Sequence, residues 1–362
     1  MKRLLLSALG WAILQPASAQ DSTDIKGTLT VSGYAEAYYN YDFNRPLNNT
    51  TPGFLYNFNR AGEVNLNLGF IKAGYTAGRL RGNLALAAGT YVNANYAAEP
   101  GVLKNVFEAN VGVKVSRNAN LWIDAGIMPS HIGFESAIGK DNWALTRSLS
   151  AENTPYYESG VKLGYTSKDD KLYLAAMYLN GWQRIQRVDG NSTPGFGTQV
   201  TYKPASSVTL NYSTFAGNDK PDSTRLMRYY HNIYGIFQLT EKLGLTAGFD
   251  YGMEQKHKGS SDYNNWLVPV LIARYTPAPK LHIALRGEYF QDKNGVIIGT
   301  GTANGFKTFG YSANVDYAVF PGVLCRVEAR NLSSRDRIFT QRTDQDLSKN
   351  NFFLTTSLSV AF

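Results

Sequence analysis

Apolar and polar residues alternate along almost the entire chain. The stretch 106–116 is representative, because Phe107, Ala109, Val111, Val113 and Val115 alternate with Glu108, Asn110, Gly112, Lys114 and Ser116. Successive side chains of a strand point to opposite faces, so this period of two predicts strands. No stretch predicts a helix convincingly. The predicted strands cover 27–42, 63–77, 83–93, 106–116, 121–127, 160–165, 172–183, 196–203, 208–216, 229–239, 243–253, 266–275, 281–290, 309–319, 323–331 and 352–362.

The connections between these strands alternate between short and long. Short ones fall near Gly78, Arg117, 167–171, Pro204, 240–242, 277–279 and Pro321. An even number of about 16 strands, each of roughly ten residues, is the pattern of a tilted membrane-spanning barrel. The sequence therefore predicts an all-β fold, a transmembrane antiparallel β-barrel with short periplasmic turns and long extracellular loops.

The polar face of the strands shows which solvent lies on each side. It carries Glu108, Lys114, Asp124, Lys162, His282, Arg286, Glu288, Asp316, Arg326, Glu328 and Arg330, which are the candidate pore-lining residues. Unpaired buried charges are very costly, so these side chains are expected to line water and the apolar face to contact lipid. At about 16 strands the lumen is wide enough for an aqueous channel. A soluble β-sandwich or barrel explains neither the alternating connections nor the aromatic C-terminus.

One long segment, 128–158, follows neither period and lies between two predicted strands. A loop of this length in a compact domain is usually functional or disordered. We expect it to constrict the pore, with Glu135, Lys140, Asp141 and Arg147 at the narrowest point. Its carboxylates would then face arginines of the wall and set up a transverse field. The alternative is that the segment folds over the outer rim or contacts a neighbouring barrel.

The two ends of the chain predict export and assembly. Residues 1–19 have the charged start, short apolar stretch and A-x-A site of a signal peptide, which predicts cleavage before Gln20. Residues 20–26 are expected to be a flexible N-terminal segment, and 27–362 a single barrel. The last strand ends in Phe362 and resembles the terminal strand of bacterial outer-membrane barrels, which implies an assembly signal.

Charge and chemistry exclude several other functions. The net charge is +8, or 34 − 28 = +6 without Lys2 and Arg3, and its dispersed cations predict no nucleic-acid partner. Cys325 is the single cysteine, so no internal disulfide or thiolate cluster is expected. The sequence shows no metal-ligand spacing and no nucleotide motif, and it predicts no cofactor. No predicted strand has a histidine and a serine two apart on the lipid face, so no enzyme is expected.

Aromatic residues are frequent near the predicted strand ends. The chain has 24 tyrosines. Such residues favour an interfacial belt, with sugar stacking in the pore as the alternative. They include Tyr39, Trp122, Tyr165, Trp182, Tyr251 and Tyr317.

The long segment also carries a family resemblance. It reads Gly126-Ile127-Met128-Pro129-Ser130-His131-Ile132-Gly133-Phe134-Glu135-Ser136, then Asp141-Asn142-Trp143, Thr146-Arg147-Ser148 and Pro155-Tyr156-Tyr157-Glu158-Ser159-Gly160. This pattern resembles the OmpL-like β-barrel porin family of outer-membrane proteins, and the resemblance extends over essentially the whole mature chain. It implies a channel for small solutes and does not identify the solute.

Together these patterns predict an outer-membrane porin that lets small hydrophilic solutes diffuse passively. The alternative is a non-conducting barrel that serves as scaffold for a surface or secretion complex, since both need the same wall. The expected partners are the lipid bilayer and small solutes. The oligomeric state stays open, a homo-oligomer included.

Overall fold

The computed structural model describes residues 26–342 and 346–362. The predicted signal peptide, 1–19, lies outside the described residues, as does the predicted N-terminal segment except for its last residue. None of the helices in the described part of the chain is long and apolar enough to cross a membrane.

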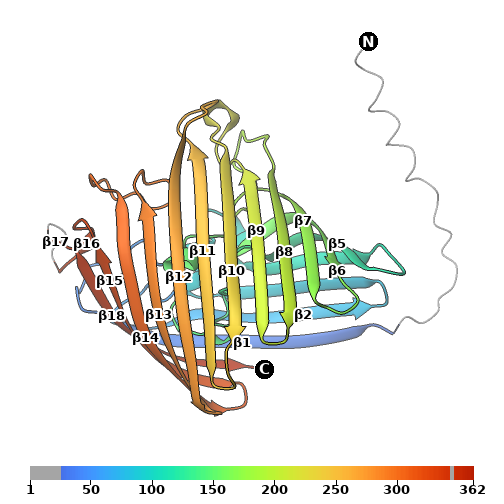
Figure 1. Cartoon of the computed structure of the whole chain (residues 1–362), viewed down its shortest axis with the longest axis horizontal. Helices are drawn as coiled ribbons and strands as arrows, with labels where there is room; N and C mark the ends of the chain where they lie inside the picture. The colour runs from blue at the N-terminus through green and yellow to red at the C-terminus, as the bar shows by residue number, and fades with distance from the viewer. Residues whose placement is uncertain (1–25, 343–345) are drawn as a thin grey trace.

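Sixteen antiparallel strands close into one barrel, and β1 pairs with β18 to complete the ring (Figure 1). The barrel strands are β1 (Thr28–Asp42), β2 (Val64–Ala77), β3 (Leu80–Ala88), β4 (Val106–Lys114), β5 (Asn120–Pro129), β6 (Tyr157–Thr166), β7 (Leu172–Leu179), β8 (Gly195–Ala205), β9 (Val208–Gly217), β10 (Arg228–Gln238), β11 (Leu243–Gln255), β12 (Tyr263–Ala278), β13 (Leu281–Asp292), β14 (Phe306–Phe320), β15 (Val323–Ser334) and β18 (Asn350–Ala361). The predicted antiparallel barrel of about 16 strands is confirmed.

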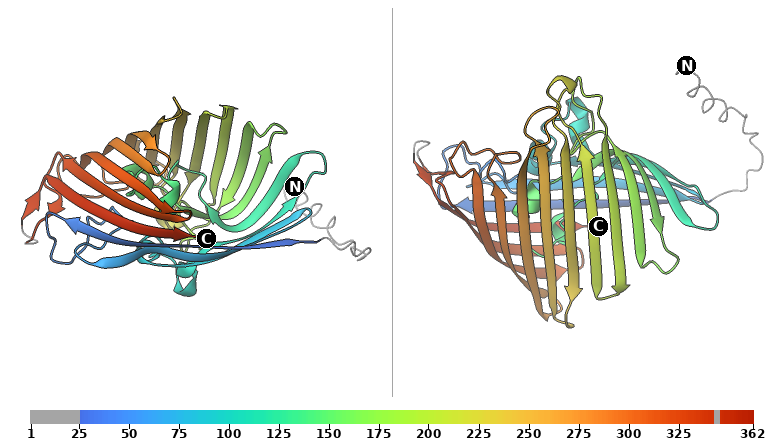
Figure 2. Two further views of the ribbon diagram at one scale, coloured as in Figure 1. Left: turned by 90° about the horizontal axis from the view of Figure 1, so that it is seen from below. Right: turned by 45° about the horizontal axis from the view of Figure 1, so that its top comes forward.

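Short elements occupy the long connections. They are the helices α1 (Thr90–Asn95) and α2 (Leu149–Glu152), the 3₁₀ turns η1 (Gly101–Asn105), η2 (Gly139–Asp141) and η3 (Asp222–Thr224), and the two-stranded ribbon of β16 (Phe339–Thr340) and β17 (Leu347–Ser348). The segment between β5 and β6, green in Figure 2, lies within the ring of strands. The barrel wall therefore surrounds this long loop.

The alternation sets the two faces of the wall, as β14 shows. Val315 and Tyr317 are exposed on the outside, while Asn314 and Asp316 are buried on the inside. Asp316 pairs in register with Arg326 of β15, and Asn314 with Glu328, so polar residues of neighbouring strands share the inner face. The apolar outer face is the one expected to contact lipid.

A bulge in β2 explains one break in the pattern. Lys72 falls on the apolar parity of the sequence, but the register between β1 and β2 shifts between Glu36 and Ala37. Because one extra residue moves all later side chains to the other face, Lys72 points into the barrel. Its Nζ lies 2.5 Å from Oε2 of Glu108.

The predicted strand 83–93 is wrong in its second half. β3 ends at Ala88 and the chain continues as α1. Gly89 makes this possible, since its φ is 128° and a Cβ would lie 2.3 Å from the Asn67 carbonyl oxygen. Only glycine tolerates this turn. The apolar pattern of the sequence continues past this turn, because Tyr91 and Val92 of α1 are also buried.

Two of the tryptophans expected in the interfacial belt lie elsewhere. Trp122 pairs with Lys114 and Gly164 on the inner face, and the Arg81 guanidinium lies 4.2 Å from the centre of its ring. Trp182 is buried against Phe215, with ring centres 5.0 Å apart. Tyr317 is half exposed on the outer wall, as a belt residue requires.

Candidate functional site

The loop between β5 and β6 crosses the inside of the barrel. Near its start, the Gly133 amide donates to Oδ1 of Asn232 on β10 over 3.1 Å. Further along, the Thr146 amide donates to Oε2 of Glu328 on β15 over 2.6 Å. These contacts join the loop to two separate parts of the wall, so it lies in the lumen and not over the outer rim. Whether it sets the narrowest point of a water path stays a prediction.

Glycines of the inner wall leave room for the large side chains of this loop. A Cβ on Gly197 of β8 would lie 2.7 Å from the His131 ring. A Cβ on Gly248 of β11 would lie 2.5 Å from Phe134, and one on Gly244 2.7 Å from Trp143. Because such distances are far below van der Waals contact, these wall positions need glycine for the loop to lie where it does.

A histidine–carboxylate pair fastens the start of the loop to its end. Nδ1 of His131 lies 2.8 Å from Oε1 of Glu158 at the beginning of β6, and Nε2 lies 2.8 Å from the carbonyl oxygen of Thr214. Both ring nitrogens thus face acceptors, so both bonds form only when the imidazole carries two protons. The pair is buried, and it fixes the loop to β6 and β9 together.

Arg147 joins two parts of the loop through hydrogen bonds. Its guanidinium donates to the carbonyl oxygens of Ser136, Ala137 and Leu145, the first over 2.7 Å and the second over 3.1 Å. The side chain is fully buried. Arg147 therefore lies inside the loop and presents no charge to water, and its place at the narrowest point stays a prediction.

Of the other three predicted constriction residues, one is buried like Arg147 and two are exposed. Glu135 is buried, accepts hydrogen bonds from the amide and hydroxyl of Ser148, and lies 3.9 Å from Arg286 of the wall. Lys140 and Asp141 form an ion pair of 2.8 Å, and each side chain is 43% exposed. Only Lys140 and Asp141 of the four predicted residues present charge to water.

Wall charges opposite the loop form one connected buried network. Arg286 on β13 lies 2.8 Å from Oε1 of Glu328 and donates to the carbonyl oxygen of Thr146 over 2.6 Å. Arg330 on β15 lies 2.7 Å from Oε1 of Glu288, whose other oxygen accepts from the Leu149 amide. All four charged side chains are buried, so their place is against the loop and not along open water. Mutual pairing and hydrogen bonds offset the cost of burying them.

The pair of Arg326 and Asp316 also holds the loop. Arg326 lies 2.6 Å from Asp316 and donates to the carbonyl oxygens of Gly139 and Asn142 over 2.7 and 3.0 Å. These two predicted lining residues are buried as well. They fix η2 to β14 and β15.

The remaining predicted lining residues lie between the loop and the short turns. Glu108 and Asp124 are buried under cations, while Lys114, Lys162 and His282 are half-buried on the inner face. His282 Nδ1 lies 3.0 Å from the hydroxyl of Thr276. This end of the lumen therefore keeps partly exposed polar side chains.

Sequence reasoning missed two inward cations at the same end, Arg81 and Arg274, and left Lys72 open between a bulge and an interfacial position. The bulge brings Lys72 into the lumen. Arg81 was expected in the short turn, but it belongs to β3 and points inwards. Arg274 belongs to the irregular strand β12, and its guanidinium lies 4.4 Å from the centre of the Trp143 ring. Within residues 26–342 and 346–362, no group of three or more His, Cys, Asp or Glu residues could hold a metal ion.

A family comparison decides what kind of barrel this is. The model of a family described as "Putative beta-barrel porin-2, OmpL-like" matches residues 28–362. The chain belongs to this family of outer-membrane porins. The resemblance inferred from the segment around Arg147 is thereby confirmed, and with it the outer membrane as the location of the porin. A search of curated proteins found no match.

Solved structures share the fold of this porin at low sequence identity. An anion-selective porin from Comamonas acidovorans aligns with TM-score 0.62 and 10% identity over 93% of this chain and 100% of that one. The outer-membrane channel DcaP of Acinetobacter baumannii aligns with TM-score 0.61 and 12% identity over 93% and 97%. The trimer form of OmpT from Vibrio cholerae aligns with TM-score 0.60 and 10% identity over 93% and 99%. These likenesses support the barrel fold.

The long loops of the porin enclose a cavity of about 730 Å³. Phe54 and Asn59 of the β1–β2 loop line it, together with Asn153 of the lumen loop, Ile298 and Arg337. The lining is largely amides, hydroxyls and apolar side chains. The cavity therefore lies among the long loops, on the extracellular side of the lumen loop.

Proposed function

We propose that this porin lets small hydrophilic solutes diffuse passively across the outer membrane, with the loop 128–158 restricting their passage. The observation that carries the proposal is a loop packed across the lumen while the space beneath it keeps half-buried Lys114, Lys162 and His282. A polar lumen narrowed by an inward loop suits a size-limited water path. Family membership supports the same conclusion.

We infer a channel and not an enzyme. The ring nitrogens of His131 are held by Glu158 and by a backbone carbonyl, so the ring is not paired with a hydroxyl nucleophile. The chemistry of the site is positioning and charge, which agrees with transport. We further propose that several copies associate, since one of the similar structures is a trimer.

The test is single-channel recording of the refolded mature protein in a planar bilayer. We expect stable current steps whose size falls when neutral polymers too large for the lumen replace small ones. A barrel that shows the heat-dependent gel mobility of a folded porin and yet passes no current would overturn the proposal.

A non-conducting scaffold is the second candidate. Burial of the network around Arg286, Glu288, Glu328 and Arg330 favours it, because these wall charges contact the loop and do not line water. Absence of current from a folded barrel is its expected result.

A further inference from the structure

The inner wall between the lumen loop and the short turns is unevenly charged. Its inward cations are Lys72, Arg81, Lys114, Lys162, Arg274 and Arg326, and its inward carboxylates are Glu36, Glu108, Asp124 and Asp316. Six cations against four carboxylates leave an excess of +2 in this part of the described lumen. We call this wall the basic vestibule.

The exposed charge of the basic vestibule is more one-sided than the count suggests. Lys72 is 33% exposed and its partner Glu108 only 8%. Arg81 is 37% exposed and its partner Asp124 only 5%. In both pairs the carboxylate is covered by wall and cation, while the cation keeps donors free towards the lumen. A passing ion therefore meets the positive member of each pair.

Two of the lysines have no counter-charge in reach. Among the residues that the structure describes, neither Nζ of Lys114 nor Nζ of Lys162 lies within 4.0 Å of a carboxylate. Lys162 stands opposite Asp124 in the register, but that carboxylate is held by Arg81 over 2.6 Å. These lysines contribute full, half-buried positive charges.

The cations lie on opposite walls. Lys72, Arg81, Lys114 and Lys162 come from β2, β3, β4 and β6, and Arg274 comes from β12. In the ring of 16 strands, β4 and β12 are eight places apart, which is half-way round. Solutes leaving the loop thus pass between positive groups on both sides.

Indole rings hold two half-buried arginines of the basic vestibule in place. The guanidiniums of Arg81 and Arg274 lie 4.2 and 4.4 Å from the ring centres of Trp122 and Trp143. Stacking on a ring fixes a guanidinium and leaves its edge N–H groups available. Fixed guanidinium edges suit carboxylate and phosphate oxygens, which they bind through paired hydrogen bonds.

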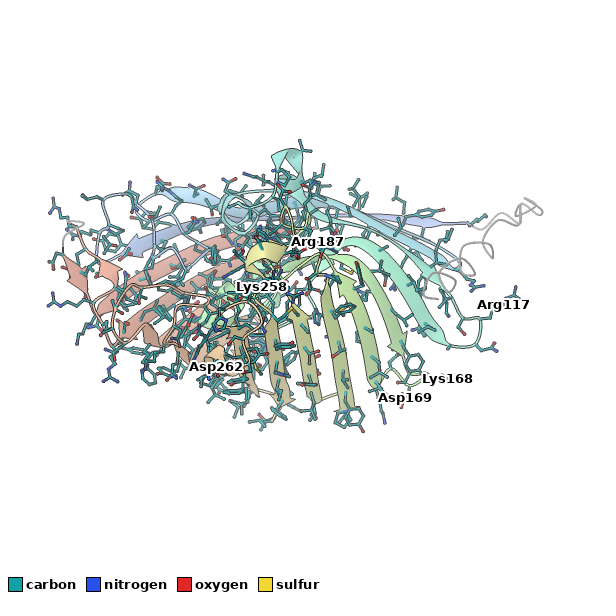
Figure 3. All side chains as sticks on the ribbon, turned by 90° about the horizontal axis from the view of Figure 1, so that it is seen from above. Arg117, Lys168, Asp169, Arg187, Lys258 and Asp262 are labelled. Atoms are coloured by element: carbon teal, nitrogen blue, oxygen red, sulfur yellow. The ribbon has the colours of Figure 1, made fainter. Side chains whose placement is uncertain are left out.

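The short turns at the same rim extend the positive field. They carry Arg79, Arg117, Lys168, Lys171, Lys242 and Lys280 against Asp169, Asp170 and Glu241. Figure 3 shows Arg117, Lys168 and Asp169 at this rim, away from Lys258 and Asp262 at the rim of the long loops. A cluster of like charge around a pore mouth raises the local concentration of counter-ions.

We propose that the basic vestibule makes this porin select small anions, both inorganic ions and carboxylates, over cations. The inference rests on the proposed function, since it names the solute class of the same lumen. The selectivity then arises in the basic vestibule, between the loop and the short turns, and not at Arg147.

The test compares two double variants that change net charge equally. Lys114→Glu/Lys162→Glu reverses the two unpaired lysines of the basic vestibule. Lys258→Glu/Lys293→Glu reverses two exposed lysines of the long loops and serves as the matched control. A Lys114→Gln/Lys162→Gln variant removes the charges without adding new ones, in case the double reversal fails to fold. Heat-dependent gel mobility checks folding of each barrel.

Reversal potentials in a KCl gradient give the chloride-over-potassium permeability ratio. We expect a ratio above one for the unaltered porin at low salt. The ratio should fall roughly fivefold in the Lys114→Glu/Lys162→Glu variant, because four charge units change about 10 Å from a passing ion in screening salt. It should fall less in the glutamine variant. The control is expected to keep the original ratio. The preference should vanish at about 1 M KCl, where the Debye length is about 3 Å.

The outcomes distinguish failure of anion selection from failure of the proposed channel function. A conducting porin with a ratio of one or below, or with equal shifts in both glutamate variants, overturns anion selection and leaves the proposed function standing. A folded, unaltered barrel without current overturns both.

Discussion

Replacing Arg147 by Ala tests whether the lumen loop is held by its own internal hydrogen bonds. The guanidinium donates to the carbonyl oxygens of Ser136, Ala137 and Leu145, and it makes no hydrogen bond to a barrel strand. The substitution therefore leaves the wall contacts intact and removes the hydrogen bonds that join two parts of the loop.

The size of the effect follows from those three bonds. Each carbonyl left without its buried donor costs about 1–3 kcal/mol, so the nominal sum is about 3–9 kcal/mol. Water can enter the space left by the side chain and satisfy part of the lost bonding, which favours the lower end, about 3 kcal/mol. Since about 1.4 kcal/mol is a tenfold change, the population of opened loop rises roughly 100-fold.

Two measurements on the Arg147→Ala variant report on this opening. Hydrogen exchange of loop amides near Ala137 and Leu145 is expected to accelerate by about the same factor, while exchange in the barrel strands stays unchanged. Single-channel recordings are expected to show more frequent fluctuations and a larger open current. Lys140→Ala is the matched control for hydrogen exchange, because its exposed ion pair with Asp141 contributes little to stability.

Unchanged exchange and unchanged current in Arg147→Ala would refute the reasoning. The loop would then be held by its contacts with the wall alone, and the buried guanidinium would be dispensable. A loss of the folded barrel would contradict it in a different way, since it would show that the loop supports the wall.

Two further predictions concern packing and pH. Gly197→Ala should force the His131 ring away from the wall and speed exchange of the loop amides, whereas Gly287→Ala, which has open space, should not. The hydrogen bond from the Asn304 side chain holds the pKa of Asp336 below its usual range. The contact between the two loops that carry these residues is therefore fully stabilised above about pH 4, and this stabilisation is lost as pH falls through the lower folded pKa. Limited proteolysis near Asn304 should therefore accelerate only in acid, and Asp336→Ala should show the fast rate already at neutral pH; a neutral-pH rate like that of the unaltered protein would contradict this.

The alternating pattern was sufficient to predict the barrel because each strand is polar on one face and apolar on the other. In β14, for example, Asp316 is inside and Tyr317 outside, as their parity indicates. Lys72 marked the bulge by breaking that parity. The turn at Gly89 gave no such sign, since both β3 and α1 bury apolar residues and a short apolar run does not distinguish strand from helix.

Parity predicts the face of a residue but not what fills the lumen opposite it. Arg286 and Glu328 point inwards as predicted, and they are nevertheless buried because the Thr146 backbone and hydroxyl lie against them. Those contacts join positions 140 and 182 residues apart in the chain. No local pattern carries such information, so the sequence could predict charges on the inner wall without predicting that a loop covers them.

The sequence did contain one sign of the covered lumen, in β12. Its inward residues Trp266, Val268, Val270 and Ile272 are all buried, and Val270 and Leu149 of α2 belong to one apolar cluster. A strand with apolar residues on both faces cannot line water on either, so in a barrel it marks the level at which a loop fills the interior. The apolar stretch ends at Arg274, whose half-buried guanidinium stacks on Trp143. That transition along one strand separates the level of the lumen that the loop fills from the part of the basic vestibule where Lys114 and Lys162 stay half-buried and available to solutes.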